Sequence, residues 1–308
     1  MPVSLDESVA YARALTRRTA GNFYFSFLTL PAAMLRDMCV LYAFMRLSDD
    51  LGDDESVPVA ERAERIDRWQ ASLQQALDGG PCAHQVFPAL VELVERRQIP
   101  PQYLFDVLAG VRTDLDPAGI ETFEDLEKYC YLVAGAVGLC CIHVWGCRDE
   151  RAVPLAIDCG TGFQLTNILR DLGDDAAQGR VYLPREDLER FGYTAADLRA
   201  GVRDRRFEDL MRFEVGRARE FYARARGLLA YLEPPGRAAA AAMLGIYGGL
   251  LDKIERRGYD VFSRRISLSR GRKLWIALGA MLRHRWRDGP RRVADPPPSA
   301  VARVPPAE

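Results

Sequence analysis

The chain has 308 residues, of which 48% are hydrophobic, enough for a sizeable buried core. Its 42 basic and 43 acidic residues nearly cancel, to a formal net charge of -1. That balance excludes a global positive field for nucleic acid, so an anionic ligand must be met by a local group of residues.

Apolar residues recur mainly at three- and four-residue spacing, without a convincing run of period-two strands. This spacing predicts helices near 5–18, 32–51, 60–77, 84–97, 101–114, 123–147, 152–175, 204–232, 235–257 and 268–286. A loop containing Gly179, Pro184 and Gly192 is expected after the seventh helix. The pattern therefore predicts an all-α protein, a single bundle of long helices. Ligand sites of such bundles lie between facing helices.

The domain organisation expected from composition is one helical domain over residues 1–288 and a disordered Pro/Arg-rich tail over 289–308. The seven cysteines form no CxxC pair, which favours reduced thiols and a cytoplasmic protein. No signal-peptide core is recognised, and no apolar run approaches the ~20 residues that span a bilayer. These features predict a soluble protein.

An acidic segment closes the predicted helix 32–51, and it reads Arg46-Leu-Ser-Asp49-Asp50-Leu-Gly-Asp53-Asp54-Glu55. Asp49 and Asp53 share a helix face, where like charges repel by roughly 0.2–0.5 kcal/mol. They also oppose the helix dipole at its C-terminus. A bound Mg²⁺ would reverse both penalties. The alternative, a helix ending in a solvated acidic loop, remains equally open from this segment alone.

A second polar stripe runs along the predicted helix 152–175. Its members share one helix face and are Gln164, Asn167, Asp171 and Asp175. Such a stripe in a hydrophobic helix is expensive to bury unpaired, and it is better explained by a metal-filled cavity than by a surface helix. If the two segments face each other, they would hold Mg²⁺ ions that bridge to a diphosphate. Three nearby guanidinium groups could bind the remaining phosphate oxygens, those of Arg46, Arg170 and Arg180.

These segments resemble motifs of the squalene/phytoene synthase family. The family's aspartate-rich motifs are matched by Asp49-Asp50-Leu-Gly-Asp53 and by Gln164-Leu-Thr-Asn167-Ile-Leu-Arg170-Asp171-Leu-Gly-Asp174-Asp175 with the following Gly179-Arg180-Val-Tyr182-Leu-Pro184. A third matching stretch is Tyr129-Cys-Tyr131-Leu-Val133-Ala-Gly135-Ala-Val137-Gly138. The resemblance runs from about Phe23 to Leu278. It implies the isoprenoid synthase type of helical fold, with a central apolar cavity.

The resemblance also implies roles for individual residues. The expected Mg²⁺ and diphosphate ligands are Asp49, Asp53, Asn167, Asp171 and Asp175. The four aspartates are expected to be catalytic together with Tyr129, which the family places near the reacting carbons. The expected substrate-binding residues are Arg46, Phe23, Val133, Val137, Gln164, Asn167, Arg170, Tyr247 and one of Arg264 and Arg265.

One segment departs from the family pattern. Many relatives carry Ser-Lys/Arg-Ser-Phe before the first long helix, whereas this chain reads Thr19-Ala20-Gly21-Asn22-Phe23, without a cation. Arg17 or Arg18 could substitute. The stretch 22–31 and the stretch 259–262 look most like bacterial presqualene diphosphate synthases of hopanoid pathways.

The activity that the resemblance implies is Mg²⁺-dependent head-to-head condensation of two farnesyl diphosphates to presqualene diphosphate. Three alternatives remain open: a complete NADPH-dependent squalene synthase, a phytoene synthase acting on geranylgeranyl diphosphate (or a dehydrosqualene synthase), and an inactive helical scaffold. NADPH is not indicated, since no GxGxxG element is present. Chain-elongating synthases and terpene cyclases fit less well, because their motifs are spaced differently.

The predicted helix 268–286 is basic at both ends and apolar between them. We expect it to pack on the bundle of a cytoplasmic protein. The alternative is peripheral contact of this helix with anionic lipid.

Overall fold

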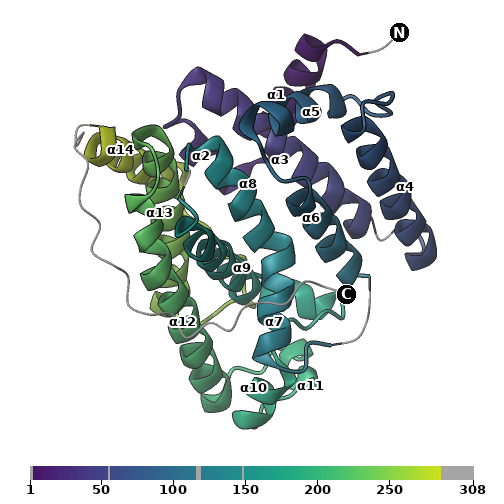
Figure 1. Ribbon diagram of the computed structural model, residues 1–308. Helices are drawn as coiled ribbons and strands as arrows, with labels where there is room; N and C mark the ends of the chain where they lie inside the picture. Colours follow the sequence, from purple (N-terminus) through teal and green to yellow (C-terminus); the bar gives the residue numbers. More distant parts are fainter. Residues whose placement is uncertain (1–2, 55, 116–118, 148, 286–308) are drawn as a thin grey trace.

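The computed structural model describes residues 3–54, 56–115, 119–147 and 149–285, and within these ranges it contains helices and no strand (Figure 1). The predicted all-α fold is thereby confirmed. One hydrophobic core extends from Ala12 to Ile266. The predicted tail 289–308 lies outside the described residues.

The helices match the predicted ranges closely, with three additions. In chain order they are α1 (Leu5–Thr19), α2 (Gly21–Phe27), α3 (Ala32–Asp53), α4 (Val59–Leu77), α5 (Phe87–Arg97), α6 (Gln102–Thr113), α7 (Phe123–Cys130), η1 (Tyr131–Gly135), α8 (Ala136–Val144), α9 (Ala152–Ala177), α10 (Arg185–Arg190), α11 (Ala195–Arg199), α12 (Arg205–Ala225), η2 (Arg226–Ala230), α13 (Pro234–Arg256) and α14 (Arg270–Arg285). The short α2, α10 and α11 were not predicted, and α10 and α11 occupy the expected loop. Helices of five to seven residues are too short to show an apolar period.

Helix α9 lies at the centre of the bundle (Figure 1). It contacts α7, η1, α8, α11, α12 and α13. Half of its 26 residues are buried, among them Leu165, Leu169 and Leu172. A helix packed on so many sides holds its polar side chains in fixed positions, because packed cores resist deformation.

Helices α7, η1 and α8 form one continuous run from Phe123 to Val144. Its middle turn, η1, is a π-helix, a feature that occurs frequently at functional sites. The run is long and apolar enough by length and composition to cross a membrane, so the expectation that no such run exists was wrong. In the fold it packs against α6 and α9.

The contact between α9 and η1 depends on Gly160. A Cβ atom at this position would lie 2.4 Å from the carbonyl oxygen of Ala134, which is backbone and cannot rotate away. In contrast, a Cβ atom at the exposed Gly216 of α12 would meet no atom within 4 Å.

Gly160→Ala is expected to destabilise the protein by about 1–3 kcal/mol, because overpacking displaces backbone. The matched control, Gly216→Ala, should be neutral or stabilise by up to ~1 kcal/mol through helix propensity. Urea unfolding followed by circular dichroism measures both. Equal stability of the two variants would contradict the close contact of α9 with η1.

Candidate active site

A polar pocket of about 260 Å³ opens between α3, α6, the α7–η1 run and α9. The residues that line it are Asp49, Gly52, Asp53, Val111, Asp114, Tyr129, Val133, Gln164, Asn167, Ile168, Asp171, Asp175, Arg180 and Tyr182. Both acidic segments, more than a hundred positions apart in sequence, therefore face one space. Its volume is below the ~300–1,000 Å³ of typical small-molecule pockets, which suits charged groups better than two prenyl chains. The expected apolar cavity stays a prediction.

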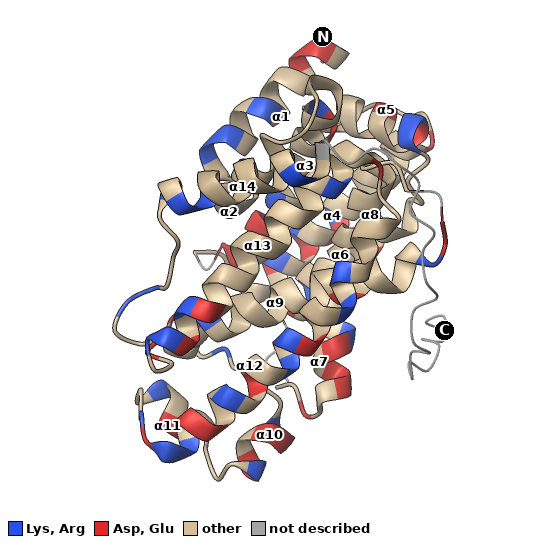
Figure 2. Ribbon diagram, turned by 90° about the vertical axis from the view of Figure 1, so that its left-hand side faces the viewer, with Lys and Arg blue, Asp and Glu red and all other residues tan. Residues whose placement is uncertain are grey.

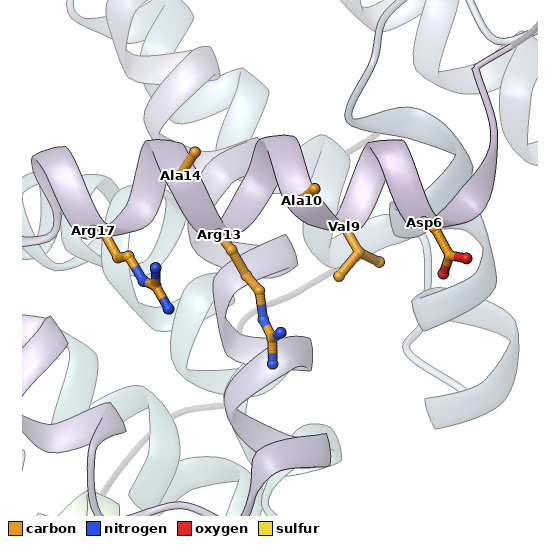
Figure 3. A pocket seen from close by; sticks show the side chains of 6 residues that line it. All are labelled: Asp6, Val9, Ala10, Arg13, Ala14 and Arg17. Carbon is orange, nitrogen blue, oxygen red and sulfur yellow. The ribbon is translucent and has the colours of Figure 1, made fainter.

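A larger hollow of about 410 Å³ lies on the outer side of α1 (Figure 3). It is lined by Asp6, Val9, Ala10, Arg13, Ala14 and Arg17, and it shares no residue with the polar pocket. Arg17, expected as a substitute for the missing family cation, thus faces this outer hollow. Arg18 is exposed and does not line the polar pocket either.

Helices α3 and α9 each contribute to the polar pocket one carboxyl with a strongly raised pKa. Burial, followed by the charge of Asp53, raises the pKa of Asp49 from 3.8 to about 7. Burial, followed by the charge of Asp171, raises the pKa of Asp175 to about 7. The Asp49 side chain is open to solvent through the mouth of the pocket, although protein atoms surround it on the other sides. Like charges crowded together at low dielectric favour the protonated form, so a cation that entered would displace protons.

Asp171 is the exception among these carboxyls. Burial acts to raise its pKa, but hydrogen bonds and charge from Arg170 and Arg265 outweigh burial and lower it. Arg265 Nε donates to Asp171 Oδ1 over 2.9 Å, and its Nη2 donates to Oδ2 over 3.0 Å. The loop that carries Arg265 approaches α9 at Gly173, where a Cβ atom would lie 3.2 Å from the carbonyl oxygen of Val261.

Asn167 carries a buried polar atom without a partner. Its Oδ1 has no hydrogen bond, while its Nδ2 donates weakly to Gln164 Oε1 over 3.3 Å. An unsatisfied buried acceptor costs about 1–3 kcal/mol, which a ligand at that atom would recover. Amide and carboxylate oxygens are the donors that Mg²⁺ prefers, so the residues present fit this ion.

Among the described residues, no three His, Cys, Asp or Glu side chains already converge on one point. This geometry does not match a metal cage built entirely from protein. It does match Mg²⁺ bound through one or two carboxylates, with waters and substrate phosphates as the other ligands.

A pair of tyrosines also lines the pocket. The hydroxyls of Tyr129 and Tyr182 both donate to Asp114 Oδ1, over 2.9 and 3.0 Å. The two rings stack with centroids 5.2 Å apart. Burial, followed by the charge of Asp114, holds the pKa of Tyr129 well above its usual value. Tyr129 is therefore a neutral phenol whose proton is directed to Asp114.

Several predicted residues lie outside the polar pocket. Tyr247 is buried and stacks on Phe163, with centroids 4.5 Å apart, and its ring lies 5.6 Å from that of Phe23. Arg46 pairs with Asp50 on α3. The others outside the lining are Val137, Arg170, Arg264 and Arg265, of which Arg170 and Arg265 contact Asp171.

Five lining residues had no predicted role: Gly52, Val111, Asp114, Ile168 and Tyr182. Tyr182 belongs to a recognised motif, so its position could have been noted. Asp114 follows α6 as one acidic residue without a second at helical spacing, and sequence periodicity offers no signal for it.

The fold and the pocket define an all-helical protein with a polar pocket between two carboxylate-bearing helices. The squalene/phytoene synthase family model matches residues 16–272. The chain is 37% identical to the phytoene synthase of Arthrospira platensis, over 92% of this chain and 96% of that protein. It is also 37% identical to the 15-cis-phytoene synthase of Synechocystis sp., over 91% of this chain and 86% of that protein.

Solved structures agree with these matches. A dehydrosqualene synthase in complex with ligand superposes with a TM-score of 0.82 at 28% identity, covering 91% of this chain and 97% of that one. Squalene synthase HpnC from Alicyclobacillus acidocaldarius superposes with a TM-score of 0.77 at 29% identity, covering 84% and 97%.

The chain belongs to the squalene/phytoene synthase family and is an enzyme of the prenyltransferase type. The family predicted from the motifs is confirmed. The finer likeness to presqualene diphosphate synthases is not: these sequence relatives are named phytoene synthases.

Arg265→Ala is expected to lower kcat/KM by about 10- to 100-fold, the range of one lost charge-assisted hydrogen bond at ~1.5–3 kcal/mol. Arg264→Ala is the matched control, because Arg264 is exposed and forms no ion pair with the described residues. It should change kcat/KM less than threefold. Steady-state kinetics with a prenyl diphosphate measures both, and equal losses would contradict the assignment of Arg265.

The metal-free protein is expected to lose stability as pH rises from about 4 to 7. The pKa values of Asp49 and Asp175 are raised from 3.8 to about 7, so in that window the folded chain binds more protons than the unfolded chain. Mg²⁺ needs the deprotonated carboxylates, and it should therefore raise Tm more at about pH 8 than at about pH 6.

Thermal melts in chelator and in Mg²⁺ test this expectation, with the double variant Asp49→Asn/Asp175→Asn as control. The control should show a flatter pH profile and a smaller response to Mg²⁺. A Mg²⁺ response in the double variant equal to that of the unchanged chain would exclude these carboxyls as the site.

Proposed function

We propose that this enzyme joins two molecules of geranylgeranyl diphosphate head to head to form phytoene, with Mg²⁺ as cofactor. The observation that carries the proposal is the single pocket faced by the carboxylates of α3 and α9. The 20-carbon chain length is supported by the phytoene synthases that share 37% of aligned residues over nearly the whole chain.

The acidic end of the pocket suits the diphosphate groups. Asp49, Asp53, Asn167, Asp171 and Asp175 would hold Mg²⁺, and the bound ion would supply the positive charge that stabilises a departing diphosphate. Arg180 already lies 3.5 Å from Asp53, and Arg265 lies 2.9 Å from Asp171. These guanidinium groups would bind phosphate oxygens beside the carboxylates.

The proposed reaction has two stages. In the first, the C1–O bond of one substrate breaks with loss of diphosphate, and the C2=C3 double bond of the other substrate attacks C1. Loss of a proton then closes a cyclopropane. In the second stage, the remaining diphosphate leaves, the cyclopropyl carbons rearrange and a second proton is lost. Because both protons leave as H⁺ and no hydride is added, phytoene formation consumes no NADPH.

Tyr129 would act on the carbons rather than on the phosphates. Its hydroxyl donates to Asp114, so the phenol oxygen would stabilise positive charge, or accept a proton while its own proton passes to Asp114. The aromatic rings of Phe163, Tyr247 and Phe23 contact one another, and they would form a wall for prenyl chains. Their faces would stabilise an allylic cation, and their bulk would exclude water.

Asp114→Ala is expected to lower kcat by at least ~10-fold with a small change in KM, because the phenols of Tyr129 and Tyr182 lose their common acceptor. Asp114→Asn keeps an acceptor oxygen without the charge, and it should lose less. Turnover kinetics and Tm are measured together for both variants. A large fall in Tm with unchanged kcat would show that Asp114 supports the fold only.

The proposal is tested by incubating purified enzyme and Mg²⁺ with geranylgeranyl diphosphate or with farnesyl diphosphate, with and without NADPH, followed by mass analysis. Phytoene from geranylgeranyl diphosphate without NADPH is the expected result. Asp171→Asn should abolish it while the circular dichroism spectrum is kept. No 40-carbon product from active enzyme would refute the chain length proposed here.

A 30-carbon product is the second candidate, and it is favoured by the superposition on dehydrosqualene and squalene synthases. Presqualene diphosphate from farnesyl diphosphate, irrespective of NADPH, would establish the first half-reaction alone. Squalene formed only with NADPH would establish a complete squalene synthase. Silence with both substrates would favour the inactive scaffold.

A further inference from the structure

Helix α14 has one apolar face turned toward the protein. On this face Ala277 and Ala280 are 3% exposed and pack on Ala242 of α13. The half-buried Lys273 lies over the ring of Phe25 in α2, 5.5 Å from its centroid. These contacts attach α14 to α13 and α2 along its inner side (Figure 1).

The opposite face of α14 is also apolar. Its four large side chains are 42–69% exposed: Leu274, Trp275, Leu278 and Leu282. We call these four residues the α14 outer face. Three of them are four residues apart, and Trp275 is three residues before Leu278, so all four lie in one stripe.

This stripe is unusual for the molecule. Of the seven large hydrophobic side chains exposed in the described residues, four belong to the α14 outer face. Helix α12 provides the contrast, because its exposed positions are charged or small, as in Arg205, Glu208 and Gly216. A surface helix normally presents such a polar side to water.

Basic residues flank the α14 outer face, and α14 contains no acidic residue. Arg270, Arg272 and Arg283 are exposed, and none of them forms an ion pair with the described residues. The neighbouring α2 carries no charge and exposes Leu28 by 46% at its end. Basic segments of α1 and α14 lie toward the same end of the bundle (Figure 2).

We propose that the α14 outer face docks on the surface of a lipid bilayer that contains anionic lipids. The leucines would enter the boundary between headgroups and acyl chains, Trp275 would lie at the headgroup level, and the arginines would contact lipid phosphates. A second copy of this chain is a poorer partner, because the arginines of two such faces would meet. The segment 286–308 is also net basic, with Arg287, Arg291, Arg292 and Arg303 against Asp288, Asp295 and Glu308.

The position of α14 connects this surface with the active site. The pKa of Lys273 is lowered by burial, then by Arg170 and Arg270, so the first turn of α14 lies near the guanidinium that holds Asp171. A bilayer bound there would lie near the active-site end of α14. The proposed docking does not depend on the chain length of the substrate. It can be measured without enzyme turnover, so its failure is distinct from failure of the proposed function.

Flotation of the full chain with vesicles tests the proposal. Vesicles of phosphatidylcholine alone are compared with vesicles that also contain phosphatidylglycerol. Binding should require the anionic lipid and weaken with salt. Arg270→Glu/Arg272→Glu should lower the partition constant at least ~25-fold, since each basic residue contributes about fivefold. The matched control, Arg205→Glu/Arg226→Glu, reverses two exposed charges on α12 and η2 and should change it less than about threefold.

The apolar contribution is tested with Leu278→Ser/Leu282→Ser, which should lower binding at least ~10-fold while Tm is unchanged, because both side chains are exposed. Vesicles should also shift tryptophan emission to the blue, and Trp275→Phe should remove that shift. Equal binding to neutral and anionic vesicles, or full binding by both double variants, would overturn the proposal. So would a dimer that Leu278→Ser/Leu282→Ser dissociates, since the face would then belong to a second copy.

Discussion

The active site depends on carboxylates of like charge that the fold holds close together. Carboxylates from α3 and α9 face one small pocket, where burial and mutual repulsion raise the pKa of Asp49 and Asp175 to about 7. Such an arrangement is unfavourable without a cation, and the fold maintains it by packing. Helix α9 is surrounded by other helices, and at Gly160 it approaches η1 so closely that no side chain fits. Rigidity of this kind suits a site that must be ready before its ligand arrives.

Arginine side chains reduce this repulsion, and contacts between residues far apart in the sequence bring them to the carboxylates. Arg265 reaches Asp171 from the loop between α13 and α14, and Arg180 reaches Asp53 from the segment after α9. As a result the carboxyls of one pocket differ in basicity, because the pKa of Asp171 is lowered while that of Asp175 is raised. One pocket can thereby offer ionised ligands at the same pH at which other carboxyls still exchange protons.

Sequence periodicity predicted the features of the site that depend on a single helix. The four-residue spacing of Asp49 and Asp53, and of Asn167, Asp171 and Asp175, fixes each set on one helix face, and the structure turns both sets into the same pocket. Residues placed by tertiary contacts could not be predicted in this way. Asp114 receives Tyr129 and Tyr182 only because α6, α7 and the segment after α9 converge. Likewise, the choice between Arg264 and Arg265 depends on the path of one loop, and the short helices α10 and α11 are too brief for a period to appear.

The central claim is that α3 and α9 contribute to one cation–diphosphate site. Paramagnetic resonance of Mn²⁺, titrated into the protein with and without inorganic diphosphate, tests it most directly. We predict bound Mn²⁺ that diphosphate enhances, and the loss of that enhancement in Asp49→Asn alone and in Asp171→Asn alone. Undiminished diphosphate-dependent binding in either single variant would contradict a shared site.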